Sequence, residues 1–197
     1  MSASLLVELF TEELPPLALR QLGEAFGRGI AGSLQKAGLV DAAAAGAARC
    51  FASPRRLAVL IANVQAGAPD RRETKKLMPV KVAFGADGKP TPALLKRLDK
   101  EGASPEGVTR AMEGNAEYAF LNQTIAGATL AAGLQAALEE AIAKLPIPKV
   151  MSYQLADGTS TVAFVRPAHG LVALHGNDIV PVSVLGLAAG RATRGHR

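Results

Sequence analysis

The sequence predicts an α+β fold, in which a mixed sheet packs with two long amphipathic helices. Apolar residues recur every three or four positions over 16–37 and again over 128–145, which is typical of helices that bury one face. Short aliphatic runs, such as 4–10 and 57–64, have the composition of strands. Because helices and strands alternate irregularly along the chain, an α+β arrangement is favoured over regular βαβ units.

The composition is that of a globular protein with an aliphatic core. The chain has 197 residues, of which 49% are hydrophobic and 20% are charged, and this length can bury a core in one large domain or two small ones. Aromatic residues make up only 4%, which argues against a surface of aromatic side chains that stack on single-stranded bases. Because no clear polar linker divides the sequence, we predict a single domain over residues 1–197.

The charge and the cysteine content favour an intracellular protein that can meet an anionic partner. The formal net charge of +5 permits a partner such as RNA. The single Cys50 cannot form an internal disulfide, which favours a reducing compartment. Glu8, Glu12 and Glu13 interrupt the apolar start, so we expect no signal peptide. No apolar run reaches membrane-spanning length, and we expect a cytoplasmic protein without a membrane partner.

Prolines and a glycine delimit the first two predicted elements, the strand at 4–10 and the helix at 16–37. Pro15 and Pro16 cannot belong to a helix interior but fit its first turn, and Gly38 is expected to end the helix. The buried stripe of this helix is predicted to consist of Leu19, Leu22, Phe26, Ile30 and Leu34.

The middle of the chain is predicted to be less regular. Segment 41–49 is rich in alanine and indicates no defined element, whereas 57–64 reads as a buried strand. Residues 67–92 are rich in proline, glycine and basic side chains. We therefore predict a basic, loop-rich insertion there, with a short strand near 81–84.

Capping residues and prolines delimit the later helices. Thr91 before Pro92 predicts an N-cap and a helix to about residue 100, and Ser104-Pro105 repeats that pattern. The long helix at 128–145 ends at "LPIPK", because each proline disfavours helical conformation in the residue before it. Further strands are predicted at 117–125, 159–165, 171–175 and 179–187, with a hairpin turn at Gly176-Asn177.

The sequence contains none of the compact motifs that mark a metal or nucleotide site. Its histidines and its cysteine show no HxxxH or CxxC spacing, and neither GxxxxGK[ST] nor GxGxxG is present. We therefore expect no metal, no ATP and no other cofactor in this chain. Cys50 is interpreted as a small apolar side chain in the core rather than as a nucleophile.

Glu12 and Glu13 stand side by side where the first strand meets the prolines. Neighbouring side chains of a strand point to opposite faces, so the two carboxylates are not expected to act together as an acid and a base. Two roles remain open for them: interaction with the positive end of the following helix, or contact with a partner protein. No residue of the chain is predicted to be catalytic.

Basic residues gather at predicted element boundaries beside proline or glycine. Arg55 and Arg56, for example, follow a turn at Ser53-Pro54. Arginine side chains held by rigid turns suit phosphate or carboxylate recognition, although solvated charges and internal ion pairs would give the same pattern. The candidates for binding RNA or a partner are Arg55, Arg56, Lys149, Arg166, His169, Arg194, His196 and Arg197.

Six short stretches follow one another along the chain. They are "TEELPP", "SPRRLAV", "LPIPK", "FVRPAH", "LG" at Leu185-Gly186, and "RGHR". In this order and spacing they resemble the beta subunit of the bacterial heterotetrameric glycyl-tRNA synthetase, from Leu5 to Arg197. Each stretch alone is weakly specific, but the ordered set is highly specific. Ser152 departs from the family pattern, which usually has arginine there, as do the segments 67–92 and 153–160.

The resemblance implies a subunit of glycine–tRNA ligase, which charges tRNA(Gly) as an assembly of two alpha and two beta subunits. Glycine activation, with ATP and Mg²⁺, belongs to the alpha subunit in this family. The family's beta subunit is much longer than 197 residues, so we expect an N-terminal fragment. The resemblance also implies a fold similar to the editing-type domain of the phenylalanyl-tRNA synthetase beta subunit.

Three functions remain open for such a fragment. The first is a non-catalytic module that binds tRNA or the alpha subunit, which the boundary arginines favour. The second is a hydrolytic editing domain, although a glycine pocket can exclude larger amino acids by size, so the need for hydrolysis is weak. The third is a purely structural assembly domain.

Overall fold

The computed structural model describes residues 1–85, 88–114, 116–155 and 158–195. These residues form two compact units, which we call unit 1 (Met1–Pro69 with Gly127–Arg197) and unit 2 (Asp70–Ala126). Where the sequence led us to expect one domain with a basic insertion over 67–92, the inserted segment is longer and has a compact fold of its own. Because compactness does not decide whether a unit folds alone, the single domain over 1–197 stays a prediction.

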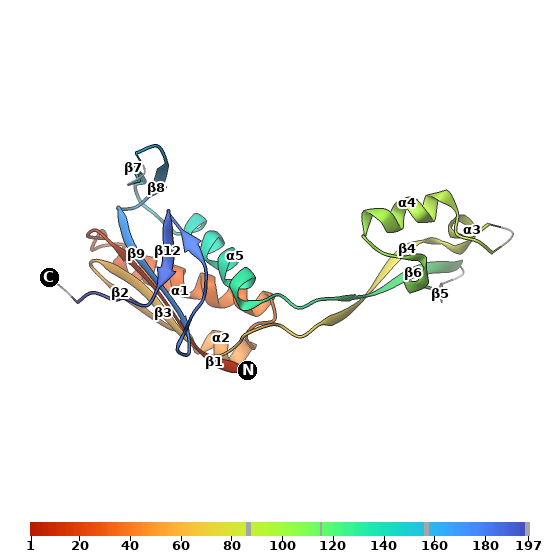
Figure 1. Ribbon diagram of the computed structural model, residues 1–197, viewed down its shortest axis with the longest axis horizontal. Helices are drawn as coiled ribbons and strands as arrows, with labels where there is room; N and C mark the ends of the chain where they lie inside the picture. Colours follow the sequence, from red (N-terminus) through yellow and green to blue (C-terminus); the bar gives the residue numbers. More distant parts are fainter. Residues whose placement is uncertain (86–87, 115, 156–157, 196–197) are drawn as a thin grey trace. The chain divides into compact units, whose positions relative to one another are not determined.

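Unit 1 is built on a seven-stranded sheet that contains β1 (Ser2–Thr11) as an inner strand (Figure 1). β1 pairs antiparallel with β3 (Arg56–Gln65) on one side and with β9 (Ala168–His175) on the other. β12 (Leu187–Gly190) pairs parallel with β9, which makes the sheet mixed, as predicted. The sheet also includes β2 (Arg49–Ser53), β10 (Asp178–Ile179) and β11 (Ser183–Val184). A separate two-stranded sheet consists of β7 (Met151–Gln154) and β8 (Thr161–Phe164).

Two helices, α1 (Leu19–Lys36) and α5 (Leu130–Ala143), lie side by side and share the main core with the sheet. Ser33 Oγ of α1 donates a 2.8 Å hydrogen bond to Glu140 Oε2 of α5. None of the described helices is both long enough and apolar enough to cross a membrane. The stripe predicted for the first helix is confirmed, because Leu19 packs against the core and the stripe's other members are buried in it, namely Leu22, Phe26, Ile30 and Leu34.

Alternation along β1 gives the sheet two different faces. Leu5, Val7 and Leu9 are fully buried in the core that includes the two helices. The residues that alternate with them, such as Glu8 and Phe10, point to the opposite face. This alternation places Glu8, the one charged side chain of β1, on the face that does not carry the main core.

Short elements of unit 1 differ from the sequence predictions. α1 begins at Leu19 because Pro15 and Pro16 form the turn that precedes it. The alanine-rich segment, for which we expected no element, contains α2 (Ala42–Gly46). The strand predicted over 179–187 is interrupted after β10, and Pro181, which lacks a backbone N–H for pairing, lies in the break.

Unit 2 is a three-stranded antiparallel sheet with helices on one face. Its strand order is β4-β6-β5, from β4 (Arg71–Pro79), β6 (Ala116–Ile125) and β5 (Val108–Glu113). The unit also contains α3 (Val80–Ala83), α4 (Pro92–Lys100) and the 3-10 turn η1 (Pro105–Gly107). Its small core consists of Ala83, Leu94, Leu98, Ala119 and Leu121.

The basic segment 67–92 is more regular than its composition suggests. We predicted a short strand near 81–84, but that prediction is wrong, because α3 covers 81–83, Phe84 forms only an isolated bridge with Pro90, and the strand lies earlier, in β4. Val82 and Phe84 have strand propensity, but Pro79 ends β4 and its fixed φ suits the start of a helical turn. Pairing with β6 stabilises β4 although most of its residues are exposed and several are charged.

The predicted cap of α4 is confirmed and provides a test of stability. Thr91 Oγ1 accepts a hydrogen bond from the Leu94 N–H at 3.4 Å and donates one to the Val82 carbonyl at 2.7 Å. Replacing Thr91 by alanine should lower the free energy of unfolding of unit 2 by about 1 kcal/mol, because both bonds are lost. Urea denaturation measures this, with Thr91→Ser as the control that keeps the hydroxyl. Equal losses in the two variants would contradict the capping role.

Candidate functional site

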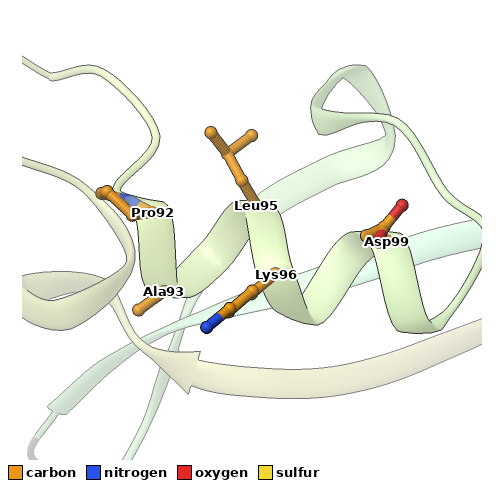
Figure 2. Close-up of a pocket in the computed structure, with 5 residues that line it drawn as sticks. All are labelled: Pro92, Ala93, Leu95, Lys96 and Asp99. Atoms are coloured by element: carbon orange, nitrogen blue, oxygen red, sulfur yellow. The ribbon is translucent and has the colours of Figure 1, made fainter.

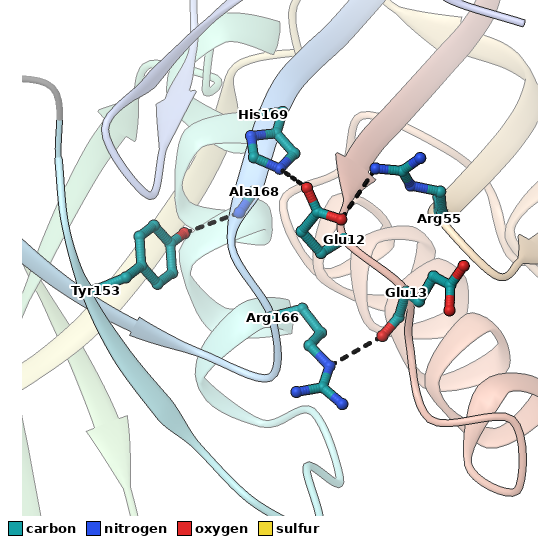
Figure 3. A network of polar contacts seen from close by, with 7 residues as sticks. All are labelled: Glu12, Glu13, Arg55, Tyr153, Arg166, Ala168 and His169. Carbon is teal, nitrogen blue, oxygen red and sulfur yellow. Dashed lines mark hydrogen bonds and ion pairs between the residues drawn. The ribbon is translucent and has the colours of Figure 1, made fainter. Parts of the chain in front are cut away.

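Several residues predicted to bind a partner come together at one end of the unit 1 sheet (Figure 3). Glu12 directly follows β1, Arg55 directly precedes β3, and His169 lies near the start of β9. Arg166 lies in the turn before β9. We call these four residues the Glu12 cluster. Its members come from distant parts of the sequence and meet because of the strand register.

Backbone hydrogen bonds fix the turns that carry the cluster. The N–H of Thr11 donates to the carbonyl of Arg55 at 3.0 Å, and the N–H of Glu12 donates to the carbonyl of Pro167 at 2.8 Å. The chain around Glu12 is therefore held on both sides by its neighbours in the sheet. This places the carboxylate between two basic side chains.

The Glu12 carboxylate contacts the side chains of both His169 and Arg55. Its Oε1 lies 2.7 Å from His169 Nε2, and its Oε2 accepts a 2.9 Å hydrogen bond from Arg55 Nη2. The hydrogen bond with His169, together with the charge of Arg55, holds the pKa of Glu12 below its ordinary value. The three side chains are 42–51% exposed, so the cluster remains open to solvent and to a partner.

Arg166 binds the same turn through the backbone of Glu13. Its Nε donates a 2.9 Å hydrogen bond to the Glu13 carbonyl, and its Nη1 lies 3.0 Å from Met151 Sδ. Tyr153 of β7 supports the neighbouring strand, because its hydroxyl accepts a 3.1 Å hydrogen bond from the N–H of Ala168 (Figure 3). The turn before β9 is thus attached both to the end of β1 and to β7.

Glu12 and Glu13 do not cap the helix that follows them, which corrects one of the roles we expected. α1 begins at Leu19, its N-cap is Ala18, and its first turn contains no acidic residue. The proline turn separates both glutamates from the helix start, so they cannot reach its free N–H groups. Figure 3 shows their side chains pointing in different directions, although both residues lie beyond the end of β1 at Thr11.

Arg56 belongs to a second, more buried network. Its Nε lies 2.7 Å from Glu8 Oε1, at ion-pair distance but outside hydrogen-bond geometry. Thr193 Oγ1 donates to the same oxygen at 3.2 Å, and Arg56 Nη2 donates to the carbonyl of Arg194. The guanidinium carbon lies 4.6 Å from the centre of the Phe10 ring. Because the Glu8 side chain is only 8% exposed, this network has a structural role and attaches the segment after β12 to the sheet.

The other predicted residues lie outside the Glu12 cluster. Lys149 is exposed between α5 and β7. Arg194 is exposed and contributes its carbonyl, rather than its side chain, to the bond with Arg56. His196 and Arg197 lie outside the described residues.

Three polar residues have contacts that the sequence analysis did not predict. Glu8 is a carboxylate inside an apolar strand, and this is a usable signal, because a buried charge needs a partner. Thr193 and Tyr153 carry no such signal. Their partners depend on how distant segments fold back on one another.

Glu12 should make the stability of unit 1 depend on pH. Folding lowers the pKa of Glu12, so its contribution is fully present above its ordinary value of 4.5 and is lost as the pH falls through the lower folded-state value. The groups that face it are Arg55 and His169. We expect Glu12→Gln to lower the melting temperature at neutral pH, and we expect this deficit to shrink when the pH falls below 4.5.

Thermal unfolding followed by circular dichroism measures the effect at neutral pH and at about pH 3. Glu13→Gln is the matched control, because Glu13 contributes its carbonyl rather than its carboxylate to the bond with Arg166. A deficit for Glu12→Gln that is equally large at both pH values would contradict the ion-pair role of Glu12.

Two hollows on the surface are lined by other residues. One follows a single face of α4, where Pro92, Leu95 and Asp99 line it (Figure 2). The other lies beside Cys50. Burial raises the pKa of the Cys50 thiol, which disfavours a nucleophilic role, although Cys50 is only partly buried. Among the residues that the structure describes, no three His, Cys, Asp or Glu side chains gather as metal ligands would.

Comparison with known proteins gives one consistent result. A family model described as "Glycyl-tRNA synthetase beta subunit" matches residues 5–197. The "Glycine--tRNA ligase beta subunit" of Leptothrix cholodnii is 59% identical over 98% of this chain and 27% of the relative. Proteins of the same name from Methylobacillus flagellatus and Dechloromonas aromatica are each 56% identical, over 99% and 100% of this chain and 29% and 28% of theirs. The chain thus spans little more than a quarter of the length of the curated relatives it matches.

Proposed function

This chain belongs to the glycyl-tRNA synthetase beta-subunit family, and from that membership we propose that it serves as a non-catalytic module of the ligase. In this proposal the module binds tRNA(Gly), the alpha subunit, or both, within a cytoplasmic assembly of two alpha and two beta subunits. Glycine activation, with ATP and Mg²⁺, takes place in the alpha subunit. The chain then contributes to ligation by positioning a partner rather than by chemistry.

The observation that carries the proposal is the Glu12 cluster. Arg55, Arg166 and His169 present nitrogen donors at one end of the sheet, on turns that backbone hydrogen bonds hold in place. Arginine forks of this kind suit phosphate oxygens, which accept two parallel hydrogen bonds. Glu12 orients two of these basic side chains but neutralises part of their charge. A protein partner with matching charges therefore fits the same surface.

A gel-shift experiment with tRNA(Gly) at low and at high salt tests the RNA part of the proposal. Contacts with phosphates release counterions, so the affinity should fall steeply as salt rises. Circular dichroism of the same sample confirms that the chain is folded. A folded chain that leaves tRNA unshifted at low salt would exclude the RNA contact.

Mixing the chain with the alpha subunit tests the protein contact. Multi-angle light scattering should show a complex heavier than either component. If the complex forms and tRNA binding is absent, the chain is the purely structural assembly domain that we kept as an alternative. If neither partner binds, the proposed function fails for this chain.

The pair of His169 and Glu12 supports a second candidate, hydrolysis of mischarged tRNA. A carboxylate 2.7 Å from an imidazole can orient it as a base toward water, and the half-exposed site is accessible. Similarity to the editing-type domain of the phenylalanyl-tRNA synthetase beta subunit, which we propose for this chain, would fit this activity. The test is deacylation of alanyl-tRNA(Gly) by the chain. Activity that is lost in His169→Ala supports the candidate, and a wild-type chain without activity excludes it.

A further inference from the structure

One face of the unit 2 sheet is covered by helices, and within the described part of this unit the opposite face is not. α3 and α4 pack on the face that includes Ala119 and Leu121 of β6. Side chains alternate along a strand, so Tyr118, Phe120 and Asn122 point to the opposite face. Both rings are partly exposed there. We call this surface the open face.

The strands on either side of β6 add polar groups to the open face. Thr74 of β4 lies opposite Asn122, and Thr109 of β5 lies opposite Phe120. Thr74 Oγ1 donates to Asn122 Oδ1 at 2.7 Å, and Asn122 Nδ2 donates to Thr109 Oγ1 at 2.8 Å. This row of hydrogen bonds joins all three strands and keeps the polar groups ordered beside the Phe120 ring.

Cationic side chains flank the two rings. Lys76 lies opposite Phe120, and its Nζ lies over the face of the Tyr118 ring, 3.6 Å from the ring centre. The same amine lies 2.6 Å from a carboxylate oxygen of Glu113, so one negative charge is also present. Arg72 extends this row on the same face of β4, because it is two and four residues before Thr74 and Lys76.

We propose that the open face binds a short single-stranded segment of RNA. Rings at positions i and i+2 of a strand are roughly 7 Å apart along it, and in sheet-type RNA-binding domains such rings stack on successive unpaired bases. Phe120 would supply one stacking surface, and Tyr118 would supply a second when a base displaces the Lys76 amine from its ring. The displaced amine and Arg72 would then face the phosphates. The Thr74, Asn122 and Thr109 row offers hydrogen bonds to base edges. The inference rests on the proposed function only in taking RNA as the ligand.

This surface also changes an expectation drawn from composition. Scarce aromatic residues argued against a stacking platform, but a low total does not prevent local concentration. Two of the chain's eight aromatic residues stand next to each other on one face. A platform for two bases needs no more than these two rings.

The chain's own tyrosines provide the direct test. It has two tyrosines and no tryptophan, so Tyr153→Phe leaves Tyr118 as the fluorescent residue. Titration with a ten-nucleotide oligouridylate should quench this fluorescence, and the affinity should fall with salt. The oligouridylate annealed to oligoadenylate should quench much less, because its bases are already stacked. An unchanged Tyr118 signal would overturn the inference.

Matched substitutions then locate the contact. Phe120→Leu keeps an apolar side chain but removes the ring, and it should weaken binding of fluorescein-labelled oligouridylate at least about five-fold. Phe51→Leu, at an exposed ring on β2 of unit 1, is the control and should leave binding unchanged. Melting curves must show both variants folded. Equal affinities for Phe120→Leu and wild type would contradict the stacking role.

The result separates this inference from the proposed function. If folded tRNA(Gly) still binds through Arg55 and Arg166 while Phe120→Leu has no effect on either RNA, the open face is not a binding surface and the proposed function stands. If oligouridylate binds at the open face while Arg55 and Arg166 prove dispensable for tRNA, the inference stands and the Glu12 cluster loses its RNA role.

Discussion

Replacing Phe26 with alanine is expected to lower the free energy of unfolding of unit 1 by about 3–5 kcal/mol. Phe26 is fully buried on α1, in the core that also contains Val7, Leu9 and Val59 of the sheet. Removing the ring leaves a cavity between the helix and the sheet, in addition to the loss of buried apolar area. The effect should appear as a lower midpoint of urea denaturation.

Because the chain has two compact units, the probe must report on unit 1 alone. Tyr153 lies in unit 1, so its fluorescence in a Tyr118→Phe background follows the unfolding of that unit. Phe51→Ala is the matched control, since Phe51 is 43% exposed on β2 and should lose less than about 1 kcal/mol. Equal losses at the two positions would show that α1 does not pack on the sheet as described.

The neighbouring arginines Arg55 and Arg56 should respond very differently to substitution by methionine. Arg56→Met leaves the Glu8 carboxylate buried without its cation, and we expect a loss of about 2–4 kcal/mol. Arg55→Met breaks a pair whose two side chains are 44% and 42% exposed, and we expect a loss of at most about 1 kcal/mol. Denaturation followed by Tyr153 fluorescence in the Tyr118→Phe background gives both values.

A double variant verifies the cause of the larger loss. Replacing Glu8 by glutamine in the Arg56→Met background removes the stranded charge, and it should recover part of the stability. If Arg56→Met costs no more than Arg55→Met, the buried ion pair does not stabilise the sheet. Arg56 stays a candidate for partner binding in either outcome, because its side chain is 33% exposed.

Elements with a strong local signal could be predicted from the sequence. The two long helices follow from apolar spacing, and the start of α4 follows from Thr91 before Pro92. β4 and β5 could not be predicted in the same way. β4 reads "RRETKKLMP", and it is a strand because β6 pairs along its length, which no local pattern reveals.

For the Glu12 cluster, the sequence indicated the individual residues but not that they meet in space. The individual residues were recognisable, since Arg55, Arg166 and His169 stand beside proline or glycine at element boundaries. Their grouping was not predictable, because His169 lies 157 residues from Glu12 and meets it through the pairing of β1 with β9. The internal partners of Arg55 and Arg56 also show that the ion-pair interpretation of these arginines applies alongside any binding role.

In the RNA form of the proposed function, the Glu12 cluster, rather than general positive charge, is the surface that binds tRNA(Gly). The decisive measurement is the affinity for tRNA(Gly) of two double variants that each remove two positive charges. One is Arg55→Gln with Arg166→Gln, and the other is Arg20→Gln with Arg28→Gln on α1, where the side chains are 92% and 77% exposed.

Fluorescence anisotropy over a range of salt concentrations gives the affinity and its salt slope for each variant. We predict that the cluster variant binds at least about ten-fold more weakly and that its log–log salt slope is smaller by about 2, because two phosphate contacts are lost. The α1 variant should remain close to wild type. Equal weakening of the two variants, or wild-type affinity in the cluster variant, would contradict the account.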